Sequence, residues 1–242
     1  MESQFSRTEM LLGSAAIERL QRCRVAVFGI GGVGGYAVEA LVRSGIGAID
    51  LFDNDTVSLT NLNRQLFALH STLGRLKVDV AEERIRDINP ACEVTKHALF
   101  YLPDTADSID LTIYDLVVDC VDTIAAKLEL ARRCHLNHIP IISSMGAANK
   151  MDPSAFKVAD IFDTDIDPLA KVLRKKLRKM GVPQLTVVYS KEPPMHPEQV
   201  VMMEQKNRPT PASNAFVPAA AGLVIAGEVV RQLTMSAPSK DH

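Results

Sequence analysis

A glycine-rich turn between an apolar run and a helical pattern is the feature that most constrains this chain. RVAVFG, residues 24–29, is short, apolar and rich in valine, which predicts a buried strand. A helical pattern, YAVEALVRSG, follows the turn, and AIDLFD then predicts a second strand. This order of strand, turn, helix and strand is a βαβ unit, so we expect parallel strands. The turn itself contains Gly29, Gly31, Gly32 and Gly34.

The same alternation continues along the chain. Further strands are expected at CEVTKHAL, DLVVDCVD, IPIISS and LTVVYS, the last at 185–190. Helices are expected at residues 8–22, at LGRLKVDVAEERIRDIN, at IAAKLELARRCHLN and at VPAAAGLVIAGEVVRQL. The pattern predicts an α/β fold, a Rossmann-like, mostly parallel, doubly wound sheet with helices on both faces.

We expect one domain over residues 1–242, with a nucleotide-binding core at about 23–150. The C-terminal extension, about 151–242, would contain a basic helix, a mobile loop and a closing helix. Residues 191–215 hold five prolines and no sustained periodicity, which predicts the mobile loop. The tail at 236–242 is expected to fray.

Charge and cysteine content narrow the class of protein. The net charge is -2, so the global field selects no polyanionic partner. Four cysteines form no CxxC pair, which indicates a reduced, cytoplasmic protein without zinc. The N-terminus has no signal-peptide core, and the longest apolar run, near 215–228, is shorter than the roughly 18 residues that suggest a membrane span. We therefore expect no span.

The glycine turn predicts a nucleotide site. A pyrophosphate must approach the main chain closely, where a Cβ would block it, and the helix that follows offers free N–H groups. Asp53 ends the next strand, where a carboxylate can accept hydrogen bonds from ribose hydroxyls. These features alone leave NAD, FAD and ATP open.

A set of charged and amide side chains favours ATP. Asn61, Arg64 and Gln65 follow Asp53 closely, and GRLK and DCVD add one lysine and one aspartate. The ends of parallel strands meet at one crevice, where such cations suit a triphosphate and a carboxylate suits Mg²⁺. The alternative is that Arg64 pairs with Asp55 and that Lys77 lies on a solvated helix face.

Together these residues resemble the adenylating family that includes MoeB, ThiF and ubiquitin-activating enzymes, over roughly residues 5–150. The resemblance implies catalytic roles for Arg64, Lys77, Asp122 and Arg7, with Asp122 as the Mg²⁺ ligand. It implies a homodimer, because in the family the N-terminal arginine reaches the neighbouring subunit's ATP site. A monovalent cation, Na⁺ or K⁺, is also allowed. The remaining nucleotide contacts it implies are Gly29, Gly31, Gly32, Gly34, Asp53, Asp55, Asn61 and Gln65.

The C-terminal half resembles one branch, the tRNA threonylcarbamoyladenosine dehydratases (TcdA or CsdL). SSMGAANKMDP, KVADIFDTDIDPLAK, LRKKLRKMG and VVYSKEPP carry this resemblance, and Thr123 replaces the asparagine of other branches. It implies ATP-dependent activation of the side-chain carboxylate of threonylcarbamoyladenosine in tRNA, followed by ring closure and net loss of water. A protein of a sulfur-acceptor or cysteine-desulfurase system is retained as a candidate partner.

Two other functions stay open. The first is MoeB- or ThiF-type adenylation of the C-terminal carboxylate of a ubiquitin-like sulfur carrier. The missing CxxC pairs, and the absence of any cysteine after Cys134, argue against it. The second is a non-catalytic regulator that senses NAD through the glycine turn. The charged set argues against it, because a sensor has no need of triphosphate chemistry.

The segment DPLAKVLRKKLRKMG predicts a basic helix with Asp167 as N-cap and Pro168 as first residue. Its apolar positions, Leu169, Val172, Leu173, Leu177 and Met180, are expected on one face. With the family resemblance, the helix is expected to contact tRNA phosphates; a solvated amphipathic helix is the alternative. The residues assigned to tRNA are Lys171, Arg174, Lys175, Lys176, Arg178 and Lys179.

Overall fold

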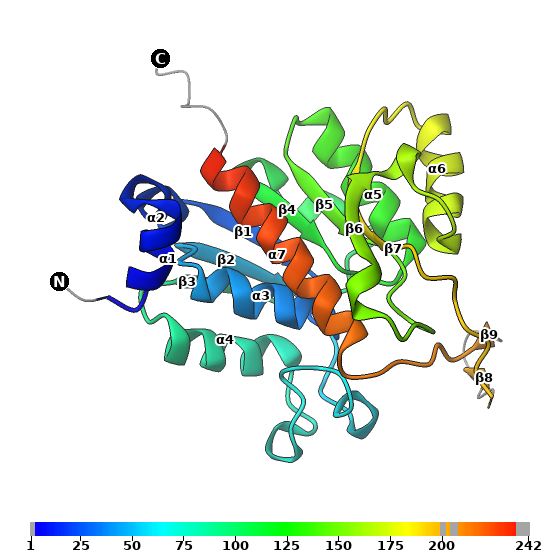
Figure 1. Cartoon of the computed structure of the whole chain (residues 1–242), viewed down its shortest axis with the longest axis horizontal. Helices are drawn as coiled ribbons and strands as arrows, with labels where there is room; N and C mark the ends of the chain where they lie inside the picture. Colours follow the sequence, from blue (N-terminus) through cyan, green and yellow to red (C-terminus); the bar gives the residue numbers. More distant parts are fainter. Residues whose placement is uncertain (1–2, 199–201, 204–207, 236–242) are drawn as a thin grey trace.

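One mixed sheet organises the molecule (Figure 1). The computed structural model describes residues 3–198, 202–203 and 208–235. In this part of the chain a seven-stranded sheet has the order β3-β2-β1-β4-β5-β7-β6. Neighbouring strands are parallel throughout, except for β6, which runs antiparallel to β7 at the edge. The expectation of a mostly parallel sheet is confirmed.

The strands and helices have the following bounds. The strands of the main sheet are β1 Arg24–Phe28, β2 Ala48–Phe52, β3 Glu93–His97, β4 Leu116–Asp119, β5 Ile141–Ser144, β6 Phe156–Asp160 and β7 Thr186–Ser190. A separate pair consists of β8 Met202–Met203 and β9 Arg208–Pro209. The helices are α1 Ser6–Leu12, α2 Ser14–Leu20, α3 Gly34–Arg43, α4 Lys77–Ile88, α5 Ile124–Leu136, α6 Pro168–Lys179 and α7 Val217–Met235.

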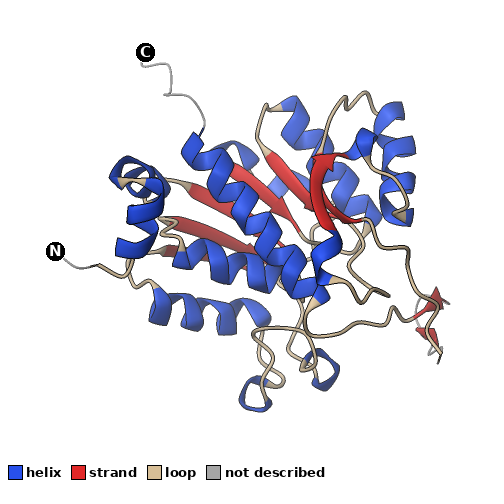
Figure 2. Cartoon of the chain, viewed as in Figure 1, coloured by secondary structure: helices blue, strands red, loops and turns tan. Residues whose placement is uncertain are grey.

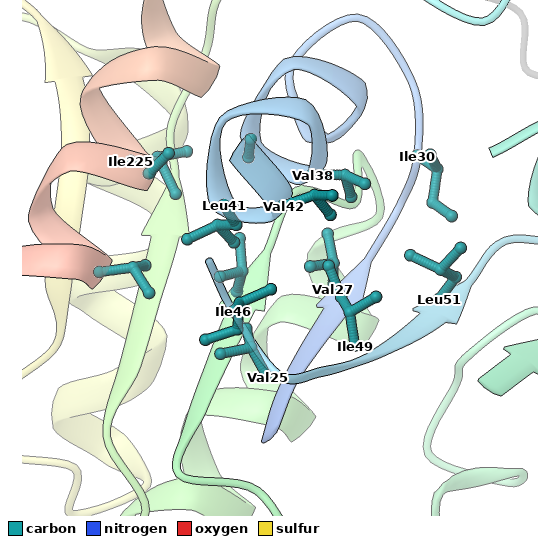
Figure 3. Packing of buried hydrophobic residues seen from close by; sticks show 14 of the residues in the cluster. Val25, Val27, Ile30, Val38, Leu41, Val42, Ile46, Ile49, Leu51 and Ile225 are labelled. Carbon is teal, nitrogen blue, oxygen red and sulfur yellow. The ribbon is translucent and has the colours of Figure 1, made fainter. Parts of the chain in front are cut away.

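The alternation of side chains along β1 explains why helices cover both faces. Val25 and Val27 point into a core shared with α3, α4 and α7, where Leu41 and Ile225 pack (Figure 3). Phe28 points to the opposite face, against α5 and the segment 99–114. Since successive side chains of a strand alternate between faces, a run of apolar residues must be buried on both sides.

The helices divide between the two faces in the doubly wound manner (Figure 2). Helices α3 and α7 lie side by side across one face, with α4 on the same side. Helices α5 and α6 cover the other face and share a core cluster with β7. The sequence order reverses between β1 and β4, so the ligand crevice of an open parallel sheet is expected beyond the ends of these two strands.

Two parts of the fold differ from expectation. The helix expected at 8–22 is two helices, because Gly13 adopts φ 86° between α1 and α2. Met10 and Leu11 are exposed, whereas Ile17 is buried. Strand β6 was not expected, since LTVVYS was interpreted as the last strand of the sheet and lies beside it as β7.

The closing helix is confirmed as α7, and Ile225 and Val229 are fully buried in it. Within the described residues, no helix is both long and apolar enough to cross a membrane. The expected mobile loop at 191–215 falls partly outside the described residues, and the expected frayed tail at 236–242 falls wholly outside them.

Candidate functional site

Two glycines of the turn are required by the protein's own backbone. Gly29 has φ 84°, and a Cβ there would lie 2.8 Å from the Cys120 carbonyl oxygen. A Cβ on Gly34 would lie 1.8 Å from the Gly29 carbonyl oxygen. Both contacts are shorter than real side chains allow, so these glycines hold the turn closed against the end of β4.

The other two glycines face away from this packing. The nearest atom to a Cβ on Gly31 would be Gln65 Nε2 at 3.7 Å. A Cβ on Gly32 would meet Pro218 Cβ at 3.3 Å and Arg64 Cγ at 3.5 Å. The open side of the turn, at the N-terminus of α3, therefore faces Arg64 and Gln65, and it has the free N–H groups that bind phosphates.

Asp53 connects the glycine turn to the end of β2. Its Oδ2 accepts a hydrogen bond from the Ile30 N–H at 2.7 Å, and its Oδ1 accepts one from the Asp55 N–H at 2.9 Å. Burial raises the pKa of Asp53, while Lys77 and the two N–H groups act in the opposite direction. Each oxygen retains a lone pair, so the carboxylate can still accept a ribose hydroxyl.

Lys77 is buried at the start of α4, with 4% of its surface exposed. Its Nζ donates to Asp55 Oδ2 at 2.7 Å and lies 3.9 Å from Asp53 Oδ1. The alternative of a lysine on a solvated helix face is therefore wrong. Asp55 is the partner of Lys77, and the pairing of Arg64 with Asp55 is not formed. Lys77 and both aspartates share one charged cluster beside the turn.

Arg64 is a half-buried cation with no carboxylate partner among the residues that the structure describes. Its Nη1 donates to the Thr60 carbonyl at 2.8 Å and to Asn63 Oδ1 at 2.9 Å. Burial lowers the pKa of the guanidinium. A partly desolvated guanidinium without a counter-ion, next to an open glycine turn, favours the binding of an anion. Phosphate suits the planar arrangement of its N–H donors.

Asn61 and Gln65 belong to the same loop as Arg64. Asn61 is buried in a 3₁₀ turn, Leu59–Asn61, and its Oδ1 accepts the Ser58 N–H at 3.1 Å. The Asn61 carbonyl accepts the N–H groups of Arg64 and Gln65, at 3.1 and 2.9 Å. Asn61 thus holds the loop that presents the other two, while Gln65 extends toward Gly31.

Asp122 lies in the turn between β4 and α5, beyond the end of the strand that neighbours β1. Its carboxylate is exposed and, among the residues that the structure describes, accepts one long hydrogen bond, 3.3 Å, from the Thr123 hydroxyl. In the described part of the chain, no three His, Cys, Asp or Glu residues form a metal-binding group. A single free carboxylate fits Mg²⁺ on a triphosphate, because Mg²⁺ takes one or two protein carboxylates and completes its shell with phosphates and water.

A fully buried ion pair supports the Asp122 turn, and sequence reasoning missed it. Lys127 Nζ lies 3.0 Å from Asp119 Oδ2 and donates to the Ser144 carbonyl at 2.7 Å. Asp119 also accepts from the Ser143 hydroxyl and from the Val121 N–H. The available signal was an aspartate inside an apolar strand, DLVVD, which burial requires to be paired.

Arg7 is exposed on α1, and the fold does not bring it to the glycine turn of its own chain. Phe5, two residues earlier, packs at Gly45, beyond the C-terminal end of α3. The glycine turn is at the opposite end of this ten-residue helix, which is about 15 Å long. Arg7 could therefore serve a nucleotide site only in another copy of the chain.

Helix α6 begins as expected, since Asp167 Oδ1 accepts the Ala170 N–H at 2.9 Å and Pro168 is the first residue. Leu173 and Leu177 are buried, but Val172 and Met180 are 40% and 38% exposed, so the expected apolar face is only partly buried.

The basic side chains of α6 divide into two groups. Arg174 donates to the Thr164 carbonyl at 2.8 Å and to its hydroxyl, and Arg178 lies over the Phe162 ring at 5.2 Å. These two arginines are engaged with their own chain. The four lysines are exposed and project from the helix: Lys171, Lys175, Lys176 and Lys179.

None of the four cysteines is an activated nucleophile. Burial raises the pKa of the Cys23 and Cys92 thiols to about 11, and of the Cys120 and Cys134 thiols to about 12. All four are free thiols. Because the thiolate is the reactive form, chemistry through a protein thioester gains no support from these residues.

Comparison with known proteins agrees with this geometry. The ThiF family profile matches residues 5–241. The tRNA threonylcarbamoyladenosine dehydratase of Bacillus subtilis is 48% identical, over 96% of this chain and 95% of that protein. The crystal structure of the Escherichia coli enzyme of the same name, TcdA, in complex with ATP has a TM-score of 0.86 and 33% identity, covering 98% of this chain and 96% of that one. The molybdopterin-synthase adenylyltransferase of E. coli is 38% identical, but over only 56% of this chain and 53% of that protein. The chain belongs to the ThiF family and, within it, to the tRNA threonylcarbamoyladenosine dehydratases.

Proposed function

We propose that the protein uses ATP to dehydrate threonylcarbamoyladenosine in tRNA, by adenylating the side-chain carboxylate and allowing the side chain to close into a ring. The observation that carries this proposal is Arg64. A half-buried guanidinium without a carboxylate partner in the described chain faces the open side of the glycine turn, which is the environment of a bound phosphate. The likeness to dehydratases over nearly the whole chain supplies the substrate class.

We propose the following roles for the nucleotide-facing residues. Asp53 accepts hydrogen bonds from the ribose, and Asp55 keeps the Lys77 ammonium in place beside it. Arg64 and Lys77 neutralise negative charge on the phosphates, while Gly31 and Gly32 let the main chain approach them. Gly29 and Gly34, expected from the resemblance to face phosphates, would act indirectly, by closing the turn.

Asp122 would hold Mg²⁺. The metal ion would neutralise charge on the departing pyrophosphate. We propose Asp122 as its protein ligand, because Glu129, the other carboxylate that lines the same groove, is bonded to Arg132 and Arg133.

The chemical logic needs no enzyme nucleophile. A carboxylate is a poor electrophile because its leaving group would be oxide, and transfer of AMP replaces it with a good one. The carbamoyl group of the same side chain can then attack the acyl carbon with a large effective-concentration advantage. The acyl–phosphate bond breaks, AMP leaves, and one proton is lost from the side chain. Burial raises the pKa of all four thiols and so disfavours the thiolate, which agrees with this route.

Several finer assignments belong to the same proposal. We propose a homodimer in which Arg7 of each chain completes the nucleotide site of the other, and a cytoplasmic location. The four exposed lysines of α6, with Arg174 and Arg178 behind them, would contact tRNA phosphates. Three further expectations stay predictions. They are a single domain over residues 1–242 whose nucleotide-binding core ends at about residue 150, a Na⁺ or K⁺ site, and a partner from a sulfur-acceptor or cysteine-desulfurase system.

One experiment tests the reaction directly. The protein is incubated with ATP, Mg²⁺ and tRNA that carries threonylcarbamoyladenosine, and the digested nucleosides are weighed. We expect the modified nucleoside to become lighter by one water, only when ATP is present. An unchanged nucleoside, with a small protein's C-terminus adenylated instead, would establish the sulfur-carrier alternative.

A second measurement tests the choice of nucleotide. Calorimetric titration should show binding of ATP with Mg²⁺ and little affinity for NAD, since Arg64 and Lys77 together match more phosphate charge than NAD carries. Tight NAD binding without ATP binding would indicate a dinucleotide sensor.

A further inference from the structure

A groove of about 610 Å³ opens on the outer side of α5, next to Asp122, and the proposed nucleotide contacts leave most of it unused. Asp122 and Thr123 form one end of the groove. Its walls come from Pro103, in the segment after β3, and from Lys176 and Met180 on α6. The groove therefore connects the proposed metal ligand to the basic helix.

The floor of the groove is apolar and belongs to α5. Ala125 and Leu128 line it, while Ala126 and Leu130 of the same helix point the other way, into the core beneath the sheet. Ala125 is exposed, whereas Leu128 is 9% exposed and belongs to the core cluster between α5 and α6, so a ligand in the groove would contact the outer edge of that cluster.

The charges on the α6 side of the groove favour a nucleic acid. Lys176 stands on its wall, and Lys175 and Lys179 are exposed on the adjoining surface of α6. Glu129 also lines the groove, but its carboxylate accepts hydrogen bonds from Arg132 at 3.0 and 2.6 Å and from Arg133 at 2.9 Å. Its negative charge is thus compensated, so the rim toward α6 stays positive.

We propose that this groove receives the modified adenosine of the tRNA, with the purine over Ala125 and Leu128 and the carboxylate-bearing side chain directed toward the Mg²⁺ that Asp122 would hold. The proposal deepens the proposed function and rests on it. The volume suits a nucleoside, because ligand pockets of this class measure roughly 300–1,000 Å³. A purine needs an apolar surface, whereas the phosphates on either side of it need the exposed lysines of α6.

The test fills the groove. Ala125 is exposed, so Ala125→Trp adds bulk to the floor without entering the core. Leu136→Trp is the matched control, because Leu136 is 61% exposed at the far end of the same helix and does not line the groove. We expect Ala125→Trp to raise the KM for modified tRNA by about tenfold or more, with the melting temperature and the Kd for ATP unchanged. Leu136→Trp should leave both constants at wild-type values.

The outcomes separate the two proposals. If the wild-type protein leaves modified tRNA unchanged, the proposed function itself is wrong. If the wild type is active and Ala125→Trp has a normal KM for tRNA, the groove does not receive the nucleoside. If Ala125→Trp raises the KM for ATP instead, the groove holds the adenine of the nucleotide, which also overturns the proposal. Should Ala125→Trp fold poorly, Ala125→Leu provides the same test, with a smaller expected increase in the KM for modified tRNA.

Discussion

The surroundings of the glycine turn and the surface of α6 both carry cations suited to phosphate, yet they are built differently. Lys77 is 4% exposed and fixed by Asp55, and Arg64 is half-buried in a loop held by Asn61. The lysines of α6 are exposed along one helix. In the first region, several contacts fix each charged side chain in one position. In the second region, the charged side chains are exposed to water and salt.

This difference has an energetic meaning. Buried charges interact strongly with a ligand because little water screens them, and the same burial makes their loss costly. Exposed lysines contribute small, additive and salt-dependent amounts. We therefore predict that the nucleotide region stabilises transition-state charge and that α6 binds a long polyanion reversibly.

The largest effect should come from the buried pair under Asp122. We expect Lys127→Met to lower the free energy of unfolding by about 3–5 kcal/mol, because it leaves Asp119 buried without its counter-ion. Lys175→Met is the matched control on exposed α6, with an expected change within about 0.5 kcal/mol. Urea unfolding measures both. Equal changes in the free energy of unfolding for the two variants would contradict the distinction between buried and exposed lysines.

The next effect concerns Asp122, the proposed metal ligand, and Arg7. Asp122→Ala should abolish turnover without loss of fold, since its exposed carboxylate supports no packing.

Arg7→Ala should still dimerise but lose about 10²–10³ in kcat, the usual cost of removing one charge-stabilising donor.

Mixing these two variants tests whether the nucleotide site is shared between chains. A heterodimer of Arg7→Ala and Asp122→Ala subunits would contain one intact site, with its arginine from one chain and its carboxylate from the other. We expect activity to return on mixing. A mixture that stays inactive while subunits demonstrably exchange would exclude the shared site.

The glycines sharpen the comparison within the nucleotide region. Gly31→Ala should fold normally and weaken ATP binding, by a few-fold to tenfold, since its Cβ meets only Gln65 yet faces the proposed phosphates. Gly34→Ala should instead unfold the turn, because its Cβ would overlap the Gly29 carbonyl. Melting temperature and calorimetry together distinguish these results. A strong loss of stability in Gly31→Ala would mean that this glycine, too, is structural.

The smallest effects are expected on α6. Replacing Lys175, Lys176 and Lys179 by alanine should weaken tRNA binding more than ATP binding. Each phosphate contact that is lost should reduce the slope of log K against log salt by about one unit. Binding measured at several salt concentrations tests this. An unchanged slope would identify α6 as a solvated amphipathic helix.

Prediction from the sequence was most successful where local periodicity is strong. The glycine turn, the βαβ unit, α5, α6 and α7 follow from apolar spacing and turn residues, because those signals act over a few neighbouring residues. Strand β6 escaped because it is an edge strand: Lys157 and Val158 are exposed in it, so it lacks the continuous apolar run of the central strands. The break at Gly13 escaped because a positive φ leaves no mark on apolar spacing.

The candidate site shows the same division. The sequence by itself determined which residues could carry the chemistry. The four glycines, Asp53, Lys77 and Asp122 stand near ends of strands and starts of helices that periodicity identifies, and Arg64 stands in the loop that follows Asp53. It also determined, through resemblance over nearly the whole chain, the branch of the family.

Only the tertiary structure decided how those residues divide their work. All four glycines look alike in the sequence, but the carbonyl of Cys120, which follows β4 and lies about ninety positions away, makes Gly29 structural and leaves Gly31 open. Similarly, the sequence left open a pairing of Arg64 with Asp55, whereas the fold pairs Asp55 with Lys77. Pairing, burial and the groove beside α5 depend on which distant segments meet. Local patterns cannot report this, because contacts between segments far apart in the chain exist only once the sheet has assembled.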